Sequence, residues 1–296
     1  MEIRVLRYFL TVAREQSITK ASEVLHITQP TLSRQLAQME EEIGVKLFDR
    51  GSRRIALTNE GLLLRRRAEE ILQLVDKTEK ELIENEEQIE GKITIGCGEI
   101  ASVQLFPQLF ESFHEKYPRV TFDLYTATAD HVKDQMDRGL VDIGLLLEPI
   151  DIERYDFIRL DVKERWVVLM RPDSPLAEKK SVSPKDLSAL PLVLPRRLRV
   201  QSELASWFGD YYENLNVLFT SNLNTNASIM VNSGLAYSIV IEGLTSFWDK
   251  SKITYRPLNP ELTATSVLAW KRGQPFSPAA TKFIAHLKCL LGMDIP

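Results

Sequence analysis

Residues 59–87 contain no proline, and this uninterrupted stretch constrains the fold more than any other feature of the chain. Mostly apolar residues recur in it at alternating steps of four and three. These residues are Leu64, Ala68, Ile71, Val75, Thr78 and Leu82. Such a heptad pattern predicts one long helix with an apolar seam along one side. The seam can pack against a second copy of the chain or against the chain's own N-terminal segment, and we expect a dimer contact.

Residues 1–58 predict three shorter helices followed by a hairpin. The first helix is expected over 3–15, where the apolar residues fall on one helical stripe. That stripe consists of Leu6, Phe9, Leu10 and Ala13. Ser17 or Thr19 can then cap a second helix that ends near Leu25, because a hydroxyl at this position accepts from a free backbone N–H.

A third helix is expected after a turn at 26–28, with Thr28 as its N-cap and Pro30 in its first turn. Gly44 is suited to end this helix. Its inward residues are predicted to be Leu32, Leu36, Met39 and Ile43. Because the second and third helices are short and joined by a tight turn, the pair is expected to form a helix-turn-helix.

Residues 45–57 predict a β-hairpin, with an apolar strand at 45–48 and a returning strand at 55–57. The loop between them is basic and rich in turn-forming residues. Its tip carries Arg50, Arg53 and Arg54. A hairpin directly after a helix-turn-helix is a wing, so the N-terminal segment is expected to be a winged helix-turn-helix.

The charge is divided unevenly along the chain. The whole chain has a formal net charge of −4, which by itself argues against nucleic-acid binding. Residues 1–67, however, hold twelve Lys/Arg against eight Asp/Glu, whereas residues 68–90 hold two against nine. Because phosphate binding requires only a local basic surface, the first segment can bind DNA and the acidic second segment cannot.

From Gly91 onward strands alternate with helices, which predicts α/β layers around a largely parallel sheet. The strands are expected at 92–95, 120–125, 142–146, 167–170, 192–194, 217–219 and 237–240. The chain thus combines an N-terminal helical, winged helix-turn-helix segment and a long linker helix with a C-terminal α/β segment.

Several runs of residues in this order are typical of one protein family. In the N-terminal segment they are Leu6–Phe9, Ala21–Leu25, Thr28–Gln35, Glu40–Arg50 and Leu57–Gly61, and in the C-terminal segment they are Phe113–Pro118 and Gly139–Gly144. On these runs the whole chain resembles the LysR-type transcriptional regulators. The resemblance implies a DNA-binding protein whose C-terminal half has two lobes like those of periplasmic binding proteins, with a small-molecule effector in the cleft.

The resemblance also implies the boundaries of the parts. Residues 1–58 would be the DNA-binding domain and 59–90 the linker and dimerisation helix. Residues 91–296 would be the effector-binding domain, with lobe I formed by 91–162 and 269–296 and lobe II by 163–268.

In a helix-turn-helix the third helix lies in the major groove with its N-terminal residues on base edges. Gln29 can pair with adenine, and Arg34 can pair with guanine or grip a phosphate. The expected DNA-binding residues are Thr28, Gln29, Pro30, Thr31, Ser33 and Arg34 on the helix and Arg50, Arg53 and Arg54 on the wing. A dimer reads two half-sites, so the operator should be roughly palindromic.

The effector site is expected where loops lead into helices, because a helix N-terminus presents free N–H groups to an anion. On lobe I the expected residues are Gly98, Glu99, Ser102 and Thr128, and on lobe II they are Arg196, Arg197, Asn224 and Thr225. The arginines can hold a carboxylate or a phosphate. Glu99 is unusual in a site for acids and favours a cationic or amide-bearing ligand.

Two other functions are open at this point. Residues 96–101 fit the G-x-G-x-x-A pattern of a dinucleotide-binding loop, so the chain could be an NAD-dependent oxidoreductase with an accessory DNA-binding head. Against this, Pro107 would fall in the third turn of the helix that follows such a loop, where proline is costly. Alternatively, the C-terminal half takes no ligand and serves only assembly.

Other chemistry is not indicated by the sequence. We expect no enzyme activity, no metal and no cofactor besides the effector, because the histidines have no metal-ligand spacing and no Walker loop or nucleophile elbow occurs. Cys97 and Cys289 fit a reducing cytoplasm. The expected partners are double-stranded DNA, the effector, the chain itself as a dimer or tetramer and, for an activator, RNA polymerase, with no membrane.

Overall fold

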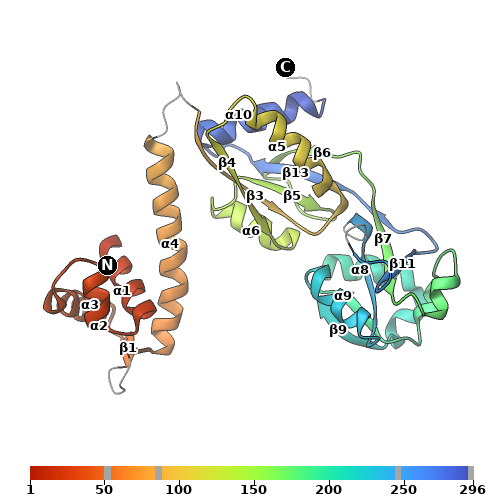
Figure 1. Ribbon diagram of the computed structural model, residues 1–296, viewed down its shortest axis with the longest axis horizontal. Coiled ribbons are helices and arrows are strands. Elements are labelled where there is room, and N and C mark those ends of the chain that lie inside the picture. Colours follow the sequence, from red (N-terminus) through yellow and green to blue (C-terminus); the bar gives the residue numbers. More distant parts are fainter. Residues whose placement is uncertain (50–54, 84–88, 244–247, 293–296) are drawn as a thin grey trace. The chain divides into compact units, whose positions relative to one another are not determined.

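The structure is a computed structural model that describes residues 1–49, 55–83, 89–243 and 248–292. The chain forms two compact units, Met1–Ile83 and Glu84–Pro296. Figure 1 shows the elements of both units. No helix in the described part of the chain combines the length and the apolar character needed to cross a membrane.

The first unit contains the three predicted short helices around a small apolar core. They are α1 (Ile3–Glu15), α2 (Ile18–Val24) and α3 (Gln29–Ile43). Ser17 caps α2 by accepting a hydrogen bond from the Lys20 N–H at 3.3 Å. The turn before α3 contains His26 in the left-handed region, with φ +54°. This tight turn makes α2 and α3 a helix-turn-helix.

Two predicted apolar stripes need correction. The buried stripe of α1 is Val5, Leu6, Phe9 and Val12, whereas Leu10 and Ala13 are only partly buried. On α3, Leu32, Leu36 and Met39 are buried as predicted, but Ile43 is 41% exposed. Ile43 is the last residue of α3, and the chain turns away at Gly44, with φ +79°, so the core does not reach it.

A hairpin and the long helix complete this unit. The first strand of the hairpin begins at Phe48 instead of covering the predicted residues 45–48, because the Leu47 N–H bonds to Glu40 rather than to a partner strand. Strands β1 (Phe48–Asp49) and β2 (Ala56–Leu57) pair antiparallel, with Phe48 opposite Leu57. Helix α4 (Asn59–Ile83) begins after Thr58, whose hydroxyl accepts from the Gly61 N–H at 3.0 Å. The buried Ala68 and Leu72 of α4 belong to the same apolar cluster as Phe9 and Phe48, so this helix is part of the N-terminal core.

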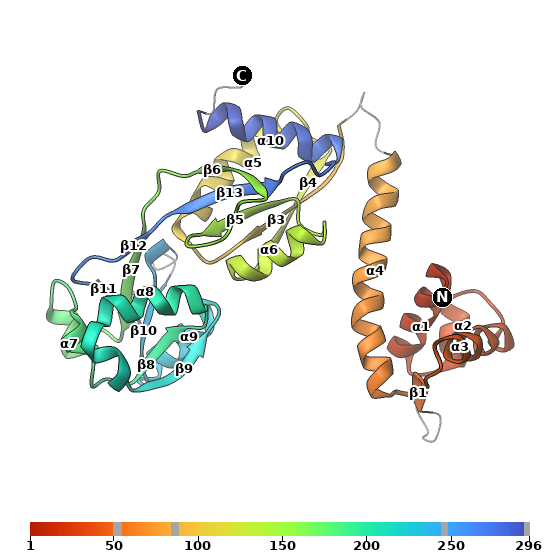
Figure 2. The ribbon, with the colours of Figure 1, turned by 180° about the vertical axis from the view of Figure 1, so that it is seen from behind.

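The second unit has two lobes, each a sheet with helices on both faces (Figures 1 and 2). The sheet of lobe I has the strand order β4-β3-β5-β13-β6. Its strands are β3 (Gly91–Cys97), β4 (Val120–Thr126), β5 (Ile143–Leu147), β6 (Tyr155–Arg159) and β13 (Ser266–Lys271). Helices α5 (Phe106–His114) and α10 (Pro278–Leu290) cover one face, and α6 (Ala129–Asp137) covers the other.

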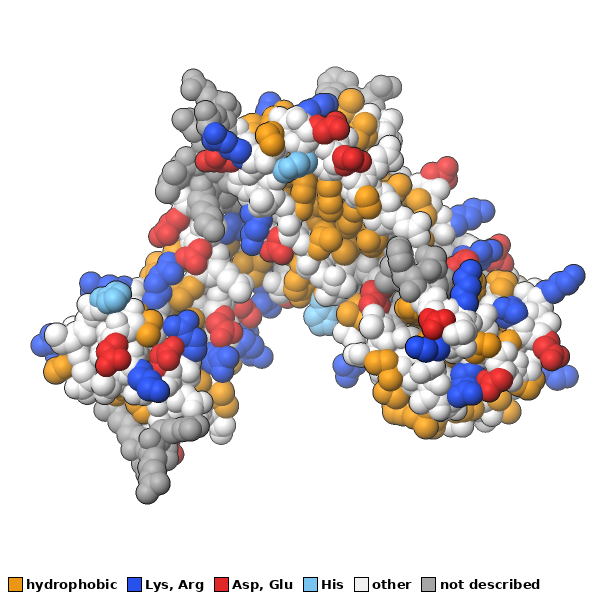
Figure 3. Space-filling model, viewed as in Figure 1, with side chains coloured by type: hydrophobic (Ala, Val, Ile, Leu, Met, Phe, Trp, Pro, Cys, Tyr) orange, Lys and Arg blue, Asp and Glu red, His pale blue; other side chains and the backbone are white. Residues whose placement is uncertain are grey.

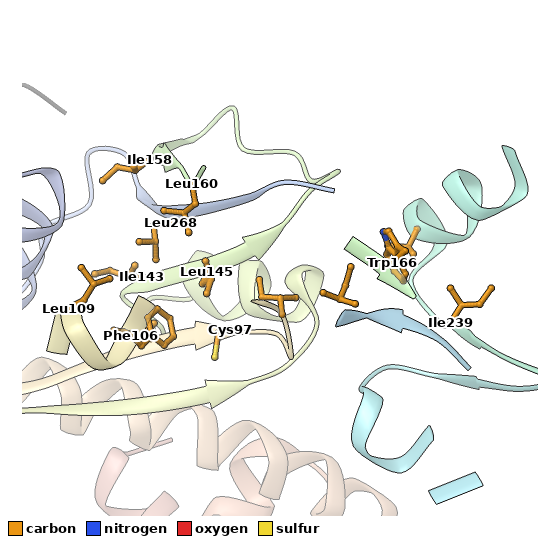
Figure 4. Close-up of a cluster of buried hydrophobic side chains, with 14 of the residues drawn as sticks. Cys97, Phe106, Leu109, Ile143, Leu145, Ile158, Leu160, Trp166, Ile239 and Leu268 are labelled. Carbon is orange, nitrogen blue, oxygen red and sulfur yellow. The ribbon is translucent and has the colours of Figure 1, made fainter. Parts of the chain in front are cut away.

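The apolar pattern of β5 explains these layers. Ile143 and Leu145 point to the face where Phe106 and Leu109 of α5 pack (Figure 4). Leu146 belongs instead to the cluster of α6 on the opposite face. A strand that is apolar on both sides is buried between helix layers, as in other α/β sheets.

The sheet of lobe II has the strand order β11-β7-β10-β8-β9, with a short strand added beside β7. Its strands are β7 (Glu164–Met170), β8 (Leu192–Pro195), β9 (Val217–Ser221), β10 (Tyr237–Ile241), β11 (Thr254–Pro257) and β12 (Thr263–Ala264). The helices of this lobe are α7 (Pro184–Leu187), α8 (Leu198–Phe208) and α9 (Asn224–Asn232). Both sheets are mixed rather than largely parallel, because β13, β7 and β11 run antiparallel to their neighbours.

The crossovers between the lobes set their boundaries. The chain leaves lobe I after β6 and enters lobe II with β7, close to the predicted position. It returns between β12 and β13, and Ser266–Ala269 pair with Gly144–Leu147 in the lobe I sheet. Residues 266–268 therefore belong to lobe I and not, as predicted, to lobe II, because the backbone of β13 bonds to β5.

Candidate functional site

The N-terminal end of α3 presents a polar surface. Gln29, Pro30 and Arg34 are exposed, whereas Thr31 and Ser33 are partly buried. In the described part of the chain, Arg34 makes no ion pair and no side-chain hydrogen bond. Its guanidinium is therefore available to a base edge or a phosphate. Arg50, Arg53 and Arg54 lie outside the described residues.

Thr28 occupies the predicted N-cap position, but its hydroxyl does not bond a backbone N–H. It lies 2.8 Å from the Thr31 hydroxyl instead, one turn further along. The two hydroxyls thus hold one another at the start of α3. This pair orders the side chains at the end of the helix that is expected to face DNA.

Glu40 connects α3 to the hairpin, and the sequence did not reveal it. Its buried carboxylate accepts from the Leu47 N–H at 2.8 Å and from the Phe48 N–H at 3.2 Å, and lies 3.1 Å from Lys46 Nζ. Burial alone raises the pKa of Glu40, but the two backbone N–H groups and Lys46 outweigh it, and the pKa is lowered. A glutamate three-quarters along a helix gives no sequence signal of such a contact.

Replacing Glu40 by alanine is expected to lower the free energy of unfolding of the first unit by about 2–4 kcal/mol, because two buried N–H groups lose their acceptor. Since the folded-state pKa is depressed, the stability from Glu40 is present above its ordinary pKa near 4.5 and is lost as the pH falls below that value. Circular dichroism at 222 nm during urea unfolding measures both effects. An exposed control, Glu41→Ala, should change little; equal losses in the two variants would contradict the role of Glu40.

The second unit contains a cavity lined from both lobes, with a volume of about 80 Å³. Among the predicted effector residues, Gly98, Glu99, Thr128, Arg196, Arg197 and Asn224 line it. Its walls are mainly apolar, which the sequence did not predict. They include Leu147 from β5, Trp166 from β7, Leu194 from β8 and Ile239 from β10. The volume exceeds the ~10–15 Å³ that one water needs, so the cavity has room for a small molecule.

Glu99 crosses from lobe I to the N-terminus of α9 in lobe II. Its carboxylate accepts hydrogen bonds from the Asn224 N–H, the Thr225 N–H and the Thr225 hydroxyl. The Glu99 carbonyl also accepts from Asn224 Nδ2 at 3.3 Å. Thr225 does not line the cavity, and its hydroxyl is engaged by Glu99. The helix N-terminus that was expected to hold an anion thus already holds a carboxylate of the chain.

Arg197 forms a second tie between the lobes. Its guanidinium is buried, with 6% of the side chain exposed, and Nε lies 2.9 Å from Asp130 Oδ2 of lobe I. The two terminal nitrogens donate to the Leu147 carbonyl at 2.9 Å and the Pro149 carbonyl at 2.6 Å. Arg197 is therefore engaged within the protein, whereas Arg196 is exposed at the cavity wall.

Ser102 lies outside the cavity, in a buried polar cluster where the lobes join. Its N–H and hydroxyl donate to Glu164 Oε1 at 3.0 and 2.6 Å, and its hydroxyl lies 2.6 Å from that of Ser266. The Ala101 N–H donates to Glu164 Oε2 at 2.7 Å. The predicted free N–H groups of this loop are thus satisfied by Glu164, which is fully buried. Pro107 lies in the first turn of α5, after a 3₁₀ turn at Ala101–Leu105.

The predicted dimer seam on α4 is only partly free. Ala68 is fully buried in the unit's own core, and Leu64 packs against the same core. Ile71 is exposed, and other large apolar residues of α4 are exposed beside it. These are Leu62, Leu63 and Leu74. The side chain of Leu82 lies outside the described part. The apolar surface of α4 left for a partner therefore centres on Ile71 and Leu74 rather than on Ala68.

Each of the two units matches the model of a known protein family. Residues 3–62 match the bacterial regulatory helix-turn-helix protein, lysR family, and residues 86–291 match the LysR substrate binding domain. The chain is 30% identical to the Bacillus subtilis HTH-type transcriptional regulator YvbU, over 99% of this chain and 100% of the relative. It is 28% identical to the Escherichia coli Hca operon transcriptional activator HcaR, over 96% of each.

Among solved structures, that of full-length CbnR complexed with its target DNA has a TM-score of 0.72 and 21% identity, over 98% of this chain and 99% of that one. At this identity the likeness concerns the fold. The two family matches together cover most of the chain. The helix-turn-helix match lies within the first unit and the substrate-binding match within the second. The chain therefore belongs to the LysR family of transcriptional regulators.

Proposed function

We propose that the chain binds a roughly palindromic operator as a dimer or tetramer, and that a small molecule between its two C-terminal lobes modulates this binding. The observation that carries the effector site is the cavity whose walls come from both lobes. Because the walls of the cavity come from both lobes, a ligand that touches both walls can change how the lobes close.

The DNA contact is proposed for the N-terminal end of α3. Gln29 and Arg34 would contact base edges or phosphates, with Thr28, Pro30, Thr31 and Ser33 beside them. The wing arginines, Arg50, Arg53 and Arg54, would contact the backbone or the minor groove. Dimerisation is proposed through the exposed apolar residues of α4 around Ile71, because an unpaired apolar stripe on a long helix favours packing with another helix.

Exposed edge strands offer a second surface for self-association. Val217, Leu218 and Phe219 on the edge strand β9 are 42%, 46% and 39% exposed. Figure 3 shows hydrophobic side chains gathered along the rim of lobe II near β9. An apolar sheet edge of this kind favours association with another chain. This supports an assembly larger than a dimer held by α4 alone.

No observation favours the oxidoreductase alternative. A dinucleotide-binding loop needs free N–H groups at the start of a long helix. Here the loop leads into a 3₁₀ turn, and its N–H groups bond to Glu164. We propose a regulator of the cytoplasm rather than an enzyme.

Arg34→Ala is expected to weaken binding to the operator about 10- to 100-fold, because a base contact by arginine is worth about 1–3 kcal/mol. The operator is first selected from random duplexes with the wild-type protein, and affinities are then measured by fluorescence anisotropy at several salt concentrations. If Arg34 holds a phosphate, the loss is uniform over sequences and the salt slope falls by about one. Arg14→Ala on α1 is the matched control, and analytical ultracentrifugation checks that the assembly is unchanged.

An unchanged affinity for Arg34→Ala would remove Arg34 from the interface. Absence of salt-dependent binding to any duplex by the wild-type protein would overturn the DNA-binding proposal itself.

A further inference from the structure

The charged groups predicted to capture an anion in the cavity are engaged within the protein. Glu99 occupies the N-terminus of α9, and Asp130 and two carbonyl groups occupy Arg197. Arg196 also lines the cavity, but its side chain is exposed, so water screens its charge. An anionic ligand would therefore have to displace Glu99 or lie beside it, where two carboxylates repel one another.

A second observation indicates what kind of ligand the cavity does take. Trp166, on β7, lines the cavity and is 3% exposed. Figure 4 shows it next to Ile239 of lobe II, which lines the same cavity. Its indole Nε1–H is buried and has no hydrogen-bond partner in the described part of the chain. A buried donor without a partner is unfavourable, and an acceptor atom of a ligand would relieve it.

We infer that the cavity selects an uncharged, largely apolar ligand with a carbonyl or amide oxygen, which accepts a hydrogen bond from Trp166, and that Glu99 excludes anions. The inference rests on the proposed effector site and specifies its ligand. Glu99 is the one carboxylate among the described residues that line the cavity, so a cation would have to bind to Glu99. The carboxylate oxygens of Glu99 already accept three hydrogen bonds, so Glu99 gives a cation little further acceptor capacity.

The size of the cavity limits the ligand as well. Its volume of about 80 Å³ is smaller than the ~150 Å³ cavity that holds benzene. In the closed arrangement the ligand is therefore a compact molecule, and isobutyramide is a suitable uncharged probe. Isobutyrate and isobutylamine have the same branched carbon skeleton. Isobutyrate differs from the amide mainly in its negative charge, whereas isobutylamine carries a positive charge and lacks the carbonyl oxygen.

The test measures the dissociation constants of the three probes by ligand-observed NMR on the full-length protein. The wild-type protein should bind isobutyramide about tenfold or more tightly than either charged probe. Glu99→Gln should gain about tenfold in affinity for isobutyrate, because the α9 N-terminus then lacks a resident charge. Trp166→Phe should lose about three- to tenfold in affinity for isobutyramide and gain nothing for isobutyrate. The exposed acid Glu115→Gln serves as the control and should match the wild type.

The inference is overturned if the wild-type protein binds isobutyrate or isobutylamine as tightly as isobutyramide, or binds none of the three. It is also overturned if Glu99→Gln leaves the affinity for isobutyrate unchanged. Operator binding is measured on the same preparations. If the protein binds the operator but does not prefer isobutyramide, the inferred ligand class is wrong. If it neither binds the operator nor prefers isobutyramide, the proposed function as a regulator is contradicted.

Discussion

Glu164→Ala is expected to lower the free energy of unfolding of the second unit by about 3–5 kcal/mol. Glu164 is fully buried, and its carboxylate accepts from the Ala101 N–H, the Ser102 N–H and the Ser102 hydroxyl. Removing it leaves the buried Ser102 N–H and the part-buried Ala101 N–H without their acceptor and the Ser102 hydroxyl with only Ser266, at about 1–3 kcal/mol for each donor that water cannot reach. A small cavity adds to the loss.

The measurement is urea unfolding followed by tryptophan fluorescence. All four tryptophans of the chain lie between residues 166 and 270, so their emission reports on the second unit alone. Glu164→Gln should lose less, because its amide oxygen can still accept. Glu178→Ala removes an exposed acid of the same lobe and should change the stability by less than about 0.5 kcal/mol. If Glu164→Ala and Glu178→Ala were equally mild, the buried cluster would not stabilise the join between the lobes.

The sequence predicted the parts of the fold that depend on local pattern. The long helix at 59–83, the turn at 26–28 and the apolar strands each carry their signal within a few residues. Pro107 belongs to this class, because a proline is tolerated only near the start of a helix, and its position excluded a long helix from residue 98 onward. The exposed polar end of α3 could likewise be predicted from the helix-turn-helix and the helix period, and its contact with DNA stays a prediction.

The sequence did not predict the contacts that join distant segments. Ser102 and Glu164 are 62 residues apart, and Glu99 and Thr225 are 126 apart. Nothing local indicates that a glutamate will fill a helix N-terminus of another lobe. The N-terminus of α9 does bind an anion, as the general rule for helix N-termini predicts. The anion is the carboxylate of Glu99 from the same chain, and the local sequence does not indicate this. For the same reason the local sequence predicts that Ser102 contacts the effector, whereas the structure places Ser102 in a buried cluster with Glu164 and Ser266.

The sequence also did not show which surface covers the apolar seam of α4. A heptad pattern shows which face of a helix is apolar, but not which surface covers that face. The chain's own core covers Ala68, and Ile71 remains exposed. The mixed direction of both sheets was missed because strand direction depends on the crossovers, and the return of the chain through β13 has no local signal.

Arg197→Met is expected to destabilise the second unit by about 2–4 kcal/mol and to loosen the contact between its lobes. The methionine keeps most of the apolar stem but loses the bonds to Asp130 and to the Leu147 and Pro149 carbonyls. Breaking a buried ion pair costs about 3–5 kcal/mol. The lower value is expected here because Asp130 is 53% exposed, so water can solvate the carboxylate that remains.

Tryptophan fluorescence in urea gives the stability, and hydrogen exchange of the amides in α8 and β5 gives the local opening. Arg199→Met is the matched control, because Arg199 is exposed two residues away and its side chain makes no hydrogen bond or ion pair within the described part of the chain. Faster exchange confined to Arg197→Met would mean that Arg197 holds the lobes together without a ligand. The two lobes would then already be in contact before the effector binds. The effector would influence DNA binding by filling the cavity between the lobes and not by bringing the lobes together. Equal exchange in the two variants would contradict this role and would leave Glu99 and Glu164 as the contacts between the lobes that resist opening.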